Sequence, residues 1–345
     1  MADGGGPTGS SVRTVVGMRL LMLGGSGFVG RAIVNEALSR DWDVTLLHRG
    51  IRRPPAGATV LQGDRTAADG LAALGDGEWD LVVDTWSARP SAVRDAADAL
   101  AKRAGRYVYV SSLSVYADPV DHGAAENGVL LDGSPDDGDV PYPQAKRGGE
   151  LAVTGAFGAA RSLLLRAGLI LGPGEDVGRL TWWLDRIARG GPVLAPGPRD
   201  LPLQYVDTRD LARWALDVAA RGLSGPYNLV SRPGHATMAE LLQACVAATG
   251  SDAELRWTDP ERIAAAGIEP WTELPLWVPP GELHEFVYGA DTSRAFADGL
   301  RCRPVAETVA DTWEWLKGLG GVSPQRPDRP VPGLTSEAEA AALRG

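Results

Sequence analysis

A short apolar run that ends in closely spaced glycines constrains this chain more than any other feature. The stretch is residues 18–30, MRLLMLGGSGFVG, and its first part, residues 18–23, is almost continuously apolar. Such a run is typical of a buried parallel strand. Glycine at the turn that follows leaves backbone N–H groups open to an anion, and a helix that begins there adds its positive N-terminal end. The sequence therefore predicts an anion-binding turn between a buried strand and a helix.

The glycine spacing identifies the kind of anion. Gly25, Gly27 and Gly30 match the general dinucleotide fingerprint, G-x-G-x-x-G, and Gly24 with Gly27 and Gly30 matches a relative of it. In a chain with 44 glycines such spacings also arise by accident, and an ordinary strand-to-helix turn is the alternative. The context favours dinucleotide binding, because residues 31–48 read as an amphipathic helix followed by a second strand.

Composition and charge exclude several classes of protein. The chain of 345 residues carries a formal net charge of -10, which weighs against a nucleic-acid-binding surface. No apolar run approaches the ~18 residues of a spanning helix, and no signal pattern is visible, so we expect a cytoplasmic protein without a membrane partner. Cys245, Cys302 and the four scattered histidines form no metal-binding spacing, and no Gly-x-Ser-x-Gly elbow is present. We therefore expect no metal site and no serine-hydrolase site.

The pattern along the chain predicts an α/β fold. Strands are expected at residues 43–48, 59–62, 80–84, 106–111, 162–166 and 227–230, and helices at 67–75, 90–104, 142–157, 207–221, 237–249 and 304–318. This alternation indicates a Rossmann, doubly wound parallel sheet with a smaller mixed C-terminal substrate domain. The expected divisions are a disordered leader at 1–17, a dinucleotide-binding domain at 18–170 to which 205–230 return, and a substrate domain at 171–204 and 231–322. Residues 323–345 read as a proline-rich linker and a short last helix, opened by a capping box at Ser336.

The loop after the second strand indicates the preferred cofactor. An NAD-binding fold places an Asp or Glu about 20 residues past the glycines, where it binds the ribose hydroxyls. This chain has His48 and Arg49 at that place, with Arg52 and Arg53 close behind. A carboxylate would repel a 2′-phosphate, whereas a guanidinium can bind it through two hydrogen bonds. The loop therefore favours NADP(H) over NAD(H), and a solvated basic loop is the alternative.

Polar side chains after the fifth strand point to proton-transfer chemistry. Tyr142 and Lys146 lie one helical turn apart and so project from one face. A cation near a phenol lowers the pKa of the phenol, as a general acid/base near neutrality needs. Ser112 ends the strand, and residues 117–141 hold seven acidic residues and no Lys or Arg. We expect that stretch to be a mobile loop over the site, either simply solvated or selective for a cationic or neutral substrate.

The chain resembles the extended short-chain dehydrogenase/reductases, the superfamily that includes nucleotide-sugar epimerases and dehydratases, over residues 18–320. The first glycine motif matches, Asp64 matches the acid that contacts adenine, and Ser112, Tyr142 and Lys146 match the catalytic residues. The resemblance implies a cofactor site made of Gly24, Gly27, Phe28, Val29, Gly30, His48, Arg49, Arg52, Asp64, Arg65, Thr85, Trp86, Ser111, Tyr142, Lys146, Ala167 and Leu169. It implies a substrate site that includes Trp86, Arg89, Ser114, Arg179, Trp182 and Tyr205.

Two departures from the family pattern concern the substrate. Leu169 stands near the place of an Asn that nucleotide-sugar enzymes carry, and Gln204 stands where they have an Arg for the sugar diphosphate, although Arg199 could substitute. These changes argue against a nucleotide sugar. The main expectation is an NADP(H)-dependent reductase or dehydrogenase of a carbonyl, imine or alcohol on a small molecule. The alternatives are an NAD(P)-dependent epimerase or dehydratase and, further off, a non-catalytic nucleotide-sensing or RNA-associated module. The resemblance is compatible with a homodimer.

Overall fold

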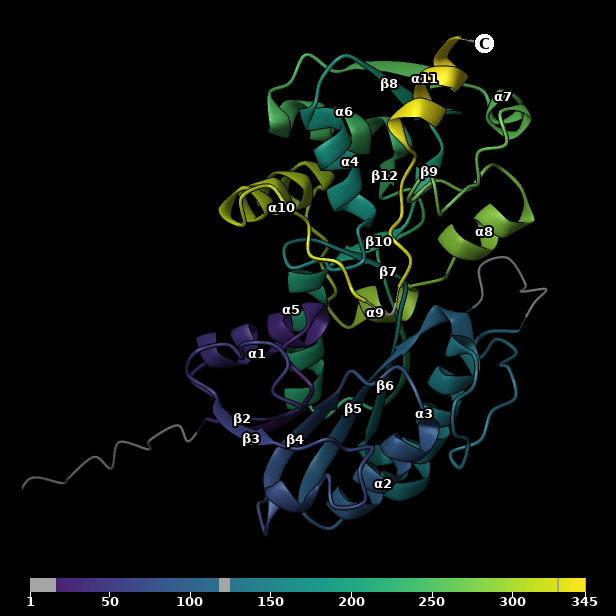
Figure 1. The fold of residues 1–345 in the computed structure, drawn as a ribbon. Helices are drawn as coiled ribbons and strands as arrows, with labels where there is room; N and C mark the ends of the chain where they lie inside the picture. Colours follow the sequence, from purple (N-terminus) through teal and green to yellow (C-terminus); the bar gives the residue numbers. More distant parts are fainter. Residues whose placement is uncertain (1–16, 118–124, 328, 345) are drawn as a thin grey trace, which may run out of the picture.

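A seven-stranded parallel sheet forms the centre of the molecule. The structure is a computed structural model that describes residues 17–117, 125–327 and 329–344. The strands follow the order β11-β6-β5-β4-β1-β2-β3 (Figure 1). They are β1 (Arg19–Leu23), β2 (Asp43–His48), β3 (Thr59–Gln62), β4 (Trp79–Asp84), β5 (Ala104–Ser112), β6 (Ser162–Ala167) and β11 (Gly225–Leu229). This order confirms the predicted Rossmann, doubly wound α/β fold.

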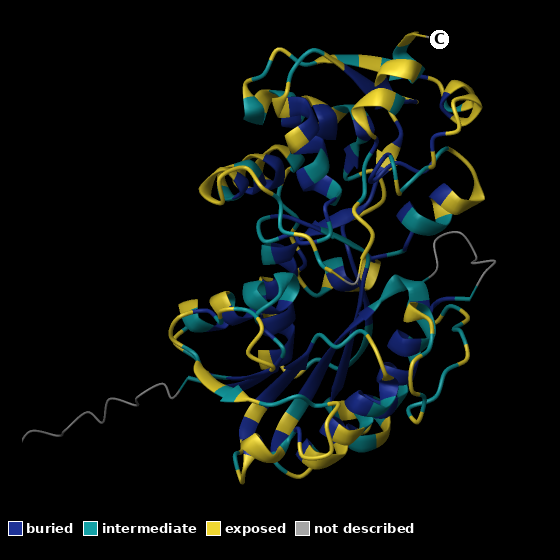
Figure 2. Ribbon diagram, in the orientation of Figure 1, coloured by how far each residue is buried: buried dark blue, intermediate teal, exposed yellow. Residues whose placement is uncertain are grey.

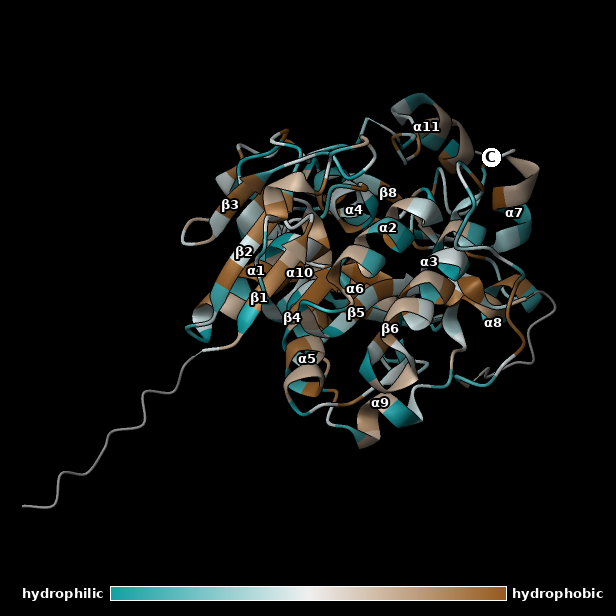
Figure 3. Cartoon of the chain, turned by 90° about the horizontal axis from the view of Figure 1, so that it is seen from below, coloured by the Kyte–Doolittle hydropathy of each residue, from teal (hydrophilic) through white to brown (hydrophobic). Residues whose placement is uncertain are grey.

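Helices cover both faces of the sheet, which is why its strands read as apolar runs. On one face lie α1 (Phe28–Ser39) and α5 (Thr208–Ala220), which share a core with alternate residues of the strands. On the other face lie α2 (Pro90–Leu100) and α3 (Tyr142–Phe157). The central strands are mostly dark blue, buried, between these layers in Figure 2, whereas the edge strand β3 is largely exposed. The strands carry much of the brown of hydrophobic residues in Figure 3.

A second hydrophobic core lies above the sheet in Figure 1. Its main helices are α4 (Arg179–Ala188), α6 (Met238–Thr249) and α10 (Val305–Gly318), and its strands form two-stranded pairs. The strands are β7 (Leu169–Leu171), β8 (Pro192–Pro196), β9 (Pro202–Leu203), β10 (Tyr205–Asp207), β12 (Ala236–Thr237) and β13 (Glu254–Thr258). The short helices of this part are α7 (Pro260–Ala265), α8 (Glu282–Tyr288) and α11 (Ser336–Arg344), whereas α9 (Ser293–Ala297) packs against the core of the sheet beside β11. This part is mixed, as predicted, while the residue boundaries of the two domains stay a prediction.

Two local predictions differ from the structure. The helix expected at 67–75 is reduced to the 3-10 turn η1 (Ala72–Leu74), because Gly70 packs directly against the backbone of Asp64 and the chain turns back there. The last helix is capped by Thr335, whose Oγ1 accepts from the N–H of Ala338 at 3.2 Å, and not by Ser336. Residues 1–16 of the expected leader, and residues 118–124 of the acidic loop, lie outside the described residues.

The segment between α10 and α11 takes an unusual path. It descends from the second core toward the sheet and then returns, as the yellow chain in Figure 1 shows. Its course brings C-terminal residues near the carboxyl ends of the strands, where ligands of such sheets bind. None of the described helices is long and apolar enough to cross a membrane.

Candidate functional site

The glycine turn is shaped as an anion site. Gly24 and Gly25 have φ of 108° and 88°, a region that L side chains rarely adopt. A Cβ at Gly30 would lie 2.6 Å from Cα of Gly25, so these two glycines let α1 approach the turn. A Cβ at Gly27 would instead meet nothing nearer than Nη1 of Arg52 at 3.8 Å. Gly27 is the N-cap of α1 and, among the described residues, no side chain caps it. The open backbone fits a pyrophosphate at a helix N-terminus.

Phe28 and Val29 begin α1 directly after this turn. Thr85 lies across from it, because a Cβ at Gly24 would be 3.0 Å from Oγ1 of Thr85. The turn therefore sits between the carboxyl ends of β1 and β4, where the resemblance placed the cofactor.

Asp64 and Arg65, expected together at the adenine end, have different surroundings. Oδ1 of Asp64 accepts from Oγ1 of Thr66 at 2.7 Å and from its N–H at 3.0 Å, and these bonds lower the pKa of the Asp64 carboxyl. Asp64 is thus a preorganised, ionised acceptor. Arg65 is buried and donates to both carboxylate oxygens of Asp84, at 2.7 and 2.9 Å, and to the carbonyl of Ala92. These bonds give Arg65 a structural task that the sequence did not reveal.

Three of the basic residues at and after the end of β2, His48, Arg49 and Arg52, have different surroundings. His48 is buried, which lowers the pKa of its imidazole and favours the neutral form, so it is no cation for a phosphate. Arg52 is paired with Asp176 at 2.5 Å. Arg49 is exposed, has no ion pair within the described part of the chain, and its charge contributes to the lowered pKa of Asp64. Of the three, Arg49 is the side chain best placed to meet an added phosphate.

Ser112 ends β5 and starts the turn η2 (Leu113–Val115). Its Oγ accepts from the N–H of Ser114 at 3.2 Å and from Oγ of Ser114 at 3.0 Å, so the two hydroxyls form one small group. The neighbouring Ser111 is buried, and its Oγ has no partner among the described residues. An orphaned hydroxyl at the carboxyl edge of the sheet is the kind of atom that a bound ligand satisfies.

Tyr142 and Lys146 occupy the first turn of α3, where Pro143 favours helix initiation. Nζ of Lys146 lies 5.9 Å from the centre of the Tyr142 ring. Tyr142 is 36% exposed, whereas Lys146 is 3% exposed. The phenol is thus accessible at the mouth of the site, and the amine lies beneath it.

Lys146 is held by the ends of two strands. Nζ donates to the carbonyl oxygens of Trp86, after β4, and of Val110, in β5, each at 2.6 Å. Burial lowers the pKa of the amine from 10.5 to about 7, while Asp84 and Glu150 act in the opposite direction. An ammonium carries one more N–H than these two carbonyls take. Lys146 is therefore fixed in place with a donor left for a ligand.

The residues expected around the substrate are only partly brought together. Trp86 lies under the guanidinium of Arg65 at 5.1 Å and donates from Nε1 to the carbonyl of Arg89. Arg89 turns outward and pairs with Asp139 through two bonds of 2.9 Å, which ties the acidic loop to the start of α2. Ala167 and Leu169, which were expected at the cofactor, lie at the end of β6 and the start of β7.

The other three expected residues come from the second core. Arg179 begins α4 and lies over the ring of Trp271 at 5.3 Å. Trp182, also on α4, packs edge-on against Trp183 at 4.7 Å. Tyr205 is buried in β10, and its hydroxyl has no partner among the described residues. Its ring belongs to the core, which places it away from a solvent-accessible wall.

Two further residues named in the sequence analysis are structural in this fold. Gln204 is fully buried and bonds to the carbonyls of Ser231 and Ala290, each at 2.8 Å. Arg199 lies over the ring of Trp257 at 5.3 Å. Both side chains thus already have partners within the protein.

The C-terminal segment also contributes to the site, which its sequence did not indicate. The guanidinium carbon of Arg329 lies 5.5 Å from the centre of the Tyr142 ring. The charge of Arg326 lowers the pKa of Lys146, so it too acts at the site. The only local signal was a pair of arginines inside a proline-rich stretch, which by itself is typical of a linker.

Comparison with known proteins identifies the family. Residues 20–229 match the NAD dependent epimerase/dehydratase family, so the chain belongs to this family. No curated protein matches the sequence significantly. The expected kinship with extended short-chain dehydrogenase/reductases is confirmed, and the protein is an NAD(P)-dependent enzyme. Of the functions weighed from the sequence, the epimerase/dehydratase alternative fits this membership better than the reductase.

Similar solved structures have the same fold. A putative epimerase from Burkholderia cenocepacia is 20% identical, with a TM-score of 0.66 over 87% of this chain and 98% of that one. The Bordetella bronchiseptica enzyme WbmG in complex with NAD and UDP is 16% identical, with a TM-score of 0.65 over 91% and 100%. The Thermus thermophilus UDP-glucose 4-epimerase in complex with NAD is 21% identical, with a TM-score of 0.60 over 87% and 99%. At these identities the likeness shows the fold.

Proposed function

We propose that this protein is an NAD(P)-dependent epimerase or dehydratase of a small molecule, with Ser112, Tyr142 and Lys146 as its catalytic residues. The observation that carries the proposal is the pairing of an accessible Tyr142 with a buried Lys146 that two strand-end carbonyls hold in place. The glycine turn supports it, because its open backbone at Gly27 fits the pyrophosphate of a dinucleotide.

Each residue has a task that follows from its surroundings. Tyr142 takes the proton of a substrate hydroxyl and later returns one, because its phenol is exposed at the cleft. Ser112 donates a hydrogen bond to the same oxygen and is oriented by Ser114. Lys146 stabilises the deprotonated phenol and binds a ribose hydroxyl with its remaining donor. The glycine turn and Lys146 would hold a dinucleotide whose nicotinamide would supply the uptake and return of a hydride.

We propose that the cofactor carries a 2′-phosphate. The support is Arg49, which is exposed and placed after β2 where an NAD enzyme has a carboxylate. Several similar structures contain NAD, WbmG among them, so the two cofactors must be compared directly on this protein. Arg52 supplies less to this preference, because Asp176 already pairs with it.

We also propose that the substrate is not a nucleotide sugar, although the WbmG structure contains UDP. The support is the local structure at the two departures from the family pattern. Gln204 is buried among backbone carbonyls, and Arg199 lies on Trp257, so neither supplies the diphosphate contact.

The test of the main proposal is the fate of the nucleotide. Protein purified without added cofactor is denatured, and the released nucleotide is identified together with its redox state. We expect oxidised NAD(P), and turnover that consumes no added cofactor, because an epimerase or dehydratase restores its hydride in each cycle. Stoichiometric consumption of NADPH with a carbonyl substrate would instead establish the reductase.

A further inference from the structure

Residues 323–327 and 329–333, called the strap below, lie across the candidate active site. It leaves α10, dips toward the sheet and rises to α11 (Figure 1). Near its start, Oγ of Ser323 lies 2.7 Å from Oγ1 of Thr181 on α4. Further on, the N–H of Arg326 donates to the carbonyl of Asp176 at 3.1 Å. Asp176 also holds Arg52 beside the glycine turn, so the strap is tied to the loop that overlies the cofactor site.

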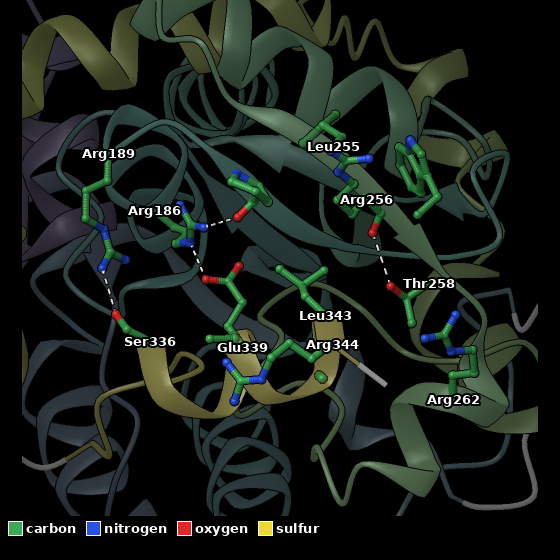
Figure 4. A pocket seen from close by; sticks show the side chains of 14 residues that line it. Arg186, Arg189, Leu255, Arg256, Thr258, Arg262, Ser336, Glu339, Leu343 and Arg344 are labelled. Atoms are coloured by element: carbon green, nitrogen blue, oxygen red, sulfur yellow. Dashed lines mark hydrogen bonds and ion pairs between the residues drawn. The ribbon is translucent and has the colours of Figure 1, made fainter.

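The far end of the strap is anchored equally well. The N–H of Gly333 donates to the carbonyl of Thr272 at 2.7 Å, and the glycine packs against the indole of Trp182. The helix α11 then binds the second core through Glu339, which accepts from Nε of Arg186 at 2.5 Å and from the N–H of Leu194 at 3.0 Å (Figure 4). Arg189 reaches Ser336 on the same helix. These contacts show that both ends of the strap are fixed to the rest of the protein.

The strap brings positive charge to the catalytic residues. The guanidinium of Arg329 lies over the ring of Tyr142, and the positive charge of Arg326 lowers the pKa of Lys146. No carboxylate among the described residues forms an ion pair with Arg329 or with Lys146. The nearby arginines that lie deeper are neutralised, since Arg52 pairs with Asp176, Arg65 with Asp84 and Arg166 with Glu150.

The positive charge of Arg329 contrasts with the protein as a whole, whose formal net charge is -10. An exposed guanidinium is well suited to a planar or tetrahedral anion, because its N–H groups form two parallel hydrogen bonds to such a group. We propose that Arg329 forms an anion subsite that holds a carboxylate or phosphate of the substrate beside Tyr142. The proposal rests on the function proposed above, because it assigns the substrate to the cleft where Tyr142 acts.

The subsite accounts for the position of the strap. A substrate anchored by its anionic group at Arg329 has its reacting hydroxyl within reach of Tyr142, since the guanidinium lies directly over that ring. In nucleotide-sugar enzymes an arginine that this chain lacks binds the sugar diphosphate. In this proposal Arg329 binds the anionic group of the substrate instead, from a different part of the chain. A small acid or a phosphorylated metabolite then replaces the nucleotide sugar as the substrate class.

The experiment measures anion binding without turnover. Protein saturated with NADP+ is titrated calorimetrically at low salt with malonate, and separately with inorganic phosphate, so that the cofactor site is already filled. The variants are Arg329→Gln and Arg329→Lys. Arg301→Gln is the matched control, because Arg301 is exposed, bonds only the carbonyl of Leu300 among the described residues and loses the same charge.

We expect wild type to bind one of the two anions, and that anion identifies carboxylate or phosphate as the natural group. Arg329→Gln should weaken this binding by about tenfold or more, and Arg329→Lys by less, because lysine keeps the charge and loses the paired hydrogen bonds. Arg301→Gln should bind as wild type does. If Arg329→Gln loosens the strap, Arg329→Lys still tests the subsite, because lysine keeps the positive charge.

Three results would overturn the subsite: no binding of either anion by wild type, equal binding by wild type and Arg329→Gln, or equal weakening by Arg329→Gln and Arg301→Gln. Failure of the proposed function looks different. In that case the released-nucleotide and cofactor-consumption assay gives the result of a reductase, while the dependence of anion binding on Arg329 persists.

Discussion

The two sides of the candidate site are built in opposite ways. The sheet side consists of regular elements, β5 and α3, which place Ser112, Tyr142 and Lys146 by hydrogen-bonded backbone and a shared core. The strap side has no regular structure, and contacts at its two ends hold Arg326 and Arg329 in place. We therefore expect catalysis and substrate recognition to depend on different parts of the chain. Changes on the sheet side should alter the rate, and changes on the strap side should alter substrate affinity.

The largest effect should come from the sheet side. Tyr142→Phe removes one hydroxyl and keeps the ring, so turnover should fall by roughly 10²-fold or more. Folding and nucleotide affinity should stay as in wild type, because Tyr142 is 36% exposed and the variant keeps the ring. Turnover is measured on any substrate that wild type converts, with the melting temperature as the control. Near-normal turnover in a folded variant would remove Tyr142 as the acid/base.

Lys146→Met should lower turnover by a similar factor and also weaken nucleotide binding, because one amine serves both the phenol and the ribose. Ser112→Ala should be milder, since it removes a hydrogen bond and no proton donor. Titration of each variant with the nucleotide measures whether Lys146→Met, but not Ser112→Ala, weakens nucleotide binding. Unchanged nucleotide affinity in Lys146→Met would contradict the assignment of its third donor.

The same lysine predicts a dependence of stability on pH. Its pKa falls from 10.5 in the unfolded chain to about 7 in the folded protein because of burial. Between these values the unfolded chain binds a proton that the folded protein does not, so this lysine makes the free energy of unfolding rise with pH. The increase should begin near pH 7 and end near pH 10.5, and it should be absent from Lys146→Met. Denaturant titrations of the cofactor-free protein across this range measure the difference, and parallel curves for the two proteins would refute it.

On the strap side, Glu339→Gln should loosen the anchor of α11. The change weakens the buried bond to Arg186 and should lower the free energy of unfolding by about 1–3 kcal/mol. Substrate affinity should fall because the strap is less well held, while nucleotide affinity should not change. Hydrogen exchange of the strap amides reports the loosening directly. Glu337→Gln is the matched control, since Glu337 lies exposed on the same helix; equal effects of the two substitutions would mean that the anchor contributes nothing.

The smallest effect concerns the cofactor phosphate. Arg49→Ala should weaken NADPH binding by roughly tenfold, the loss of one charged contact, and leave NADH binding unchanged. Arg53→Ala provides a comparison in the same loop. Titrations with both nucleotides decide the matter: equal affinities of wild type for NADPH and NADH, or equal weakening of both by Arg49→Ala, would remove the phosphate contact.

The sequence by itself determined the parts of the protein that depend on local spacing. The glycine turn, the alternating strands and helices and the pair of Tyr142 and Lys146 are each written in neighbouring residues, because a turn, a strand and a helical face repeat over a few positions. The expected helix at 67–75 failed, since Gly70 packs against Asp64 in a way that helical periodicity does not register.

Only the tertiary structure decided how distant residues are used. Asp84 pairs with Arg65, and the carbonyl oxygens of Trp86 and Val110 hold Lys146 in a buried position that lowers its pKa. The strap carries Arg329 to Tyr142 across more than half the length of the chain. These contacts depend on where the second core places α4, α10 and α11 above the sheet, which no local pattern records. The spacing of neighbouring residues indicated the chemistry of the site. The packing of distant residues decided which charges are paired there and which segments surround it.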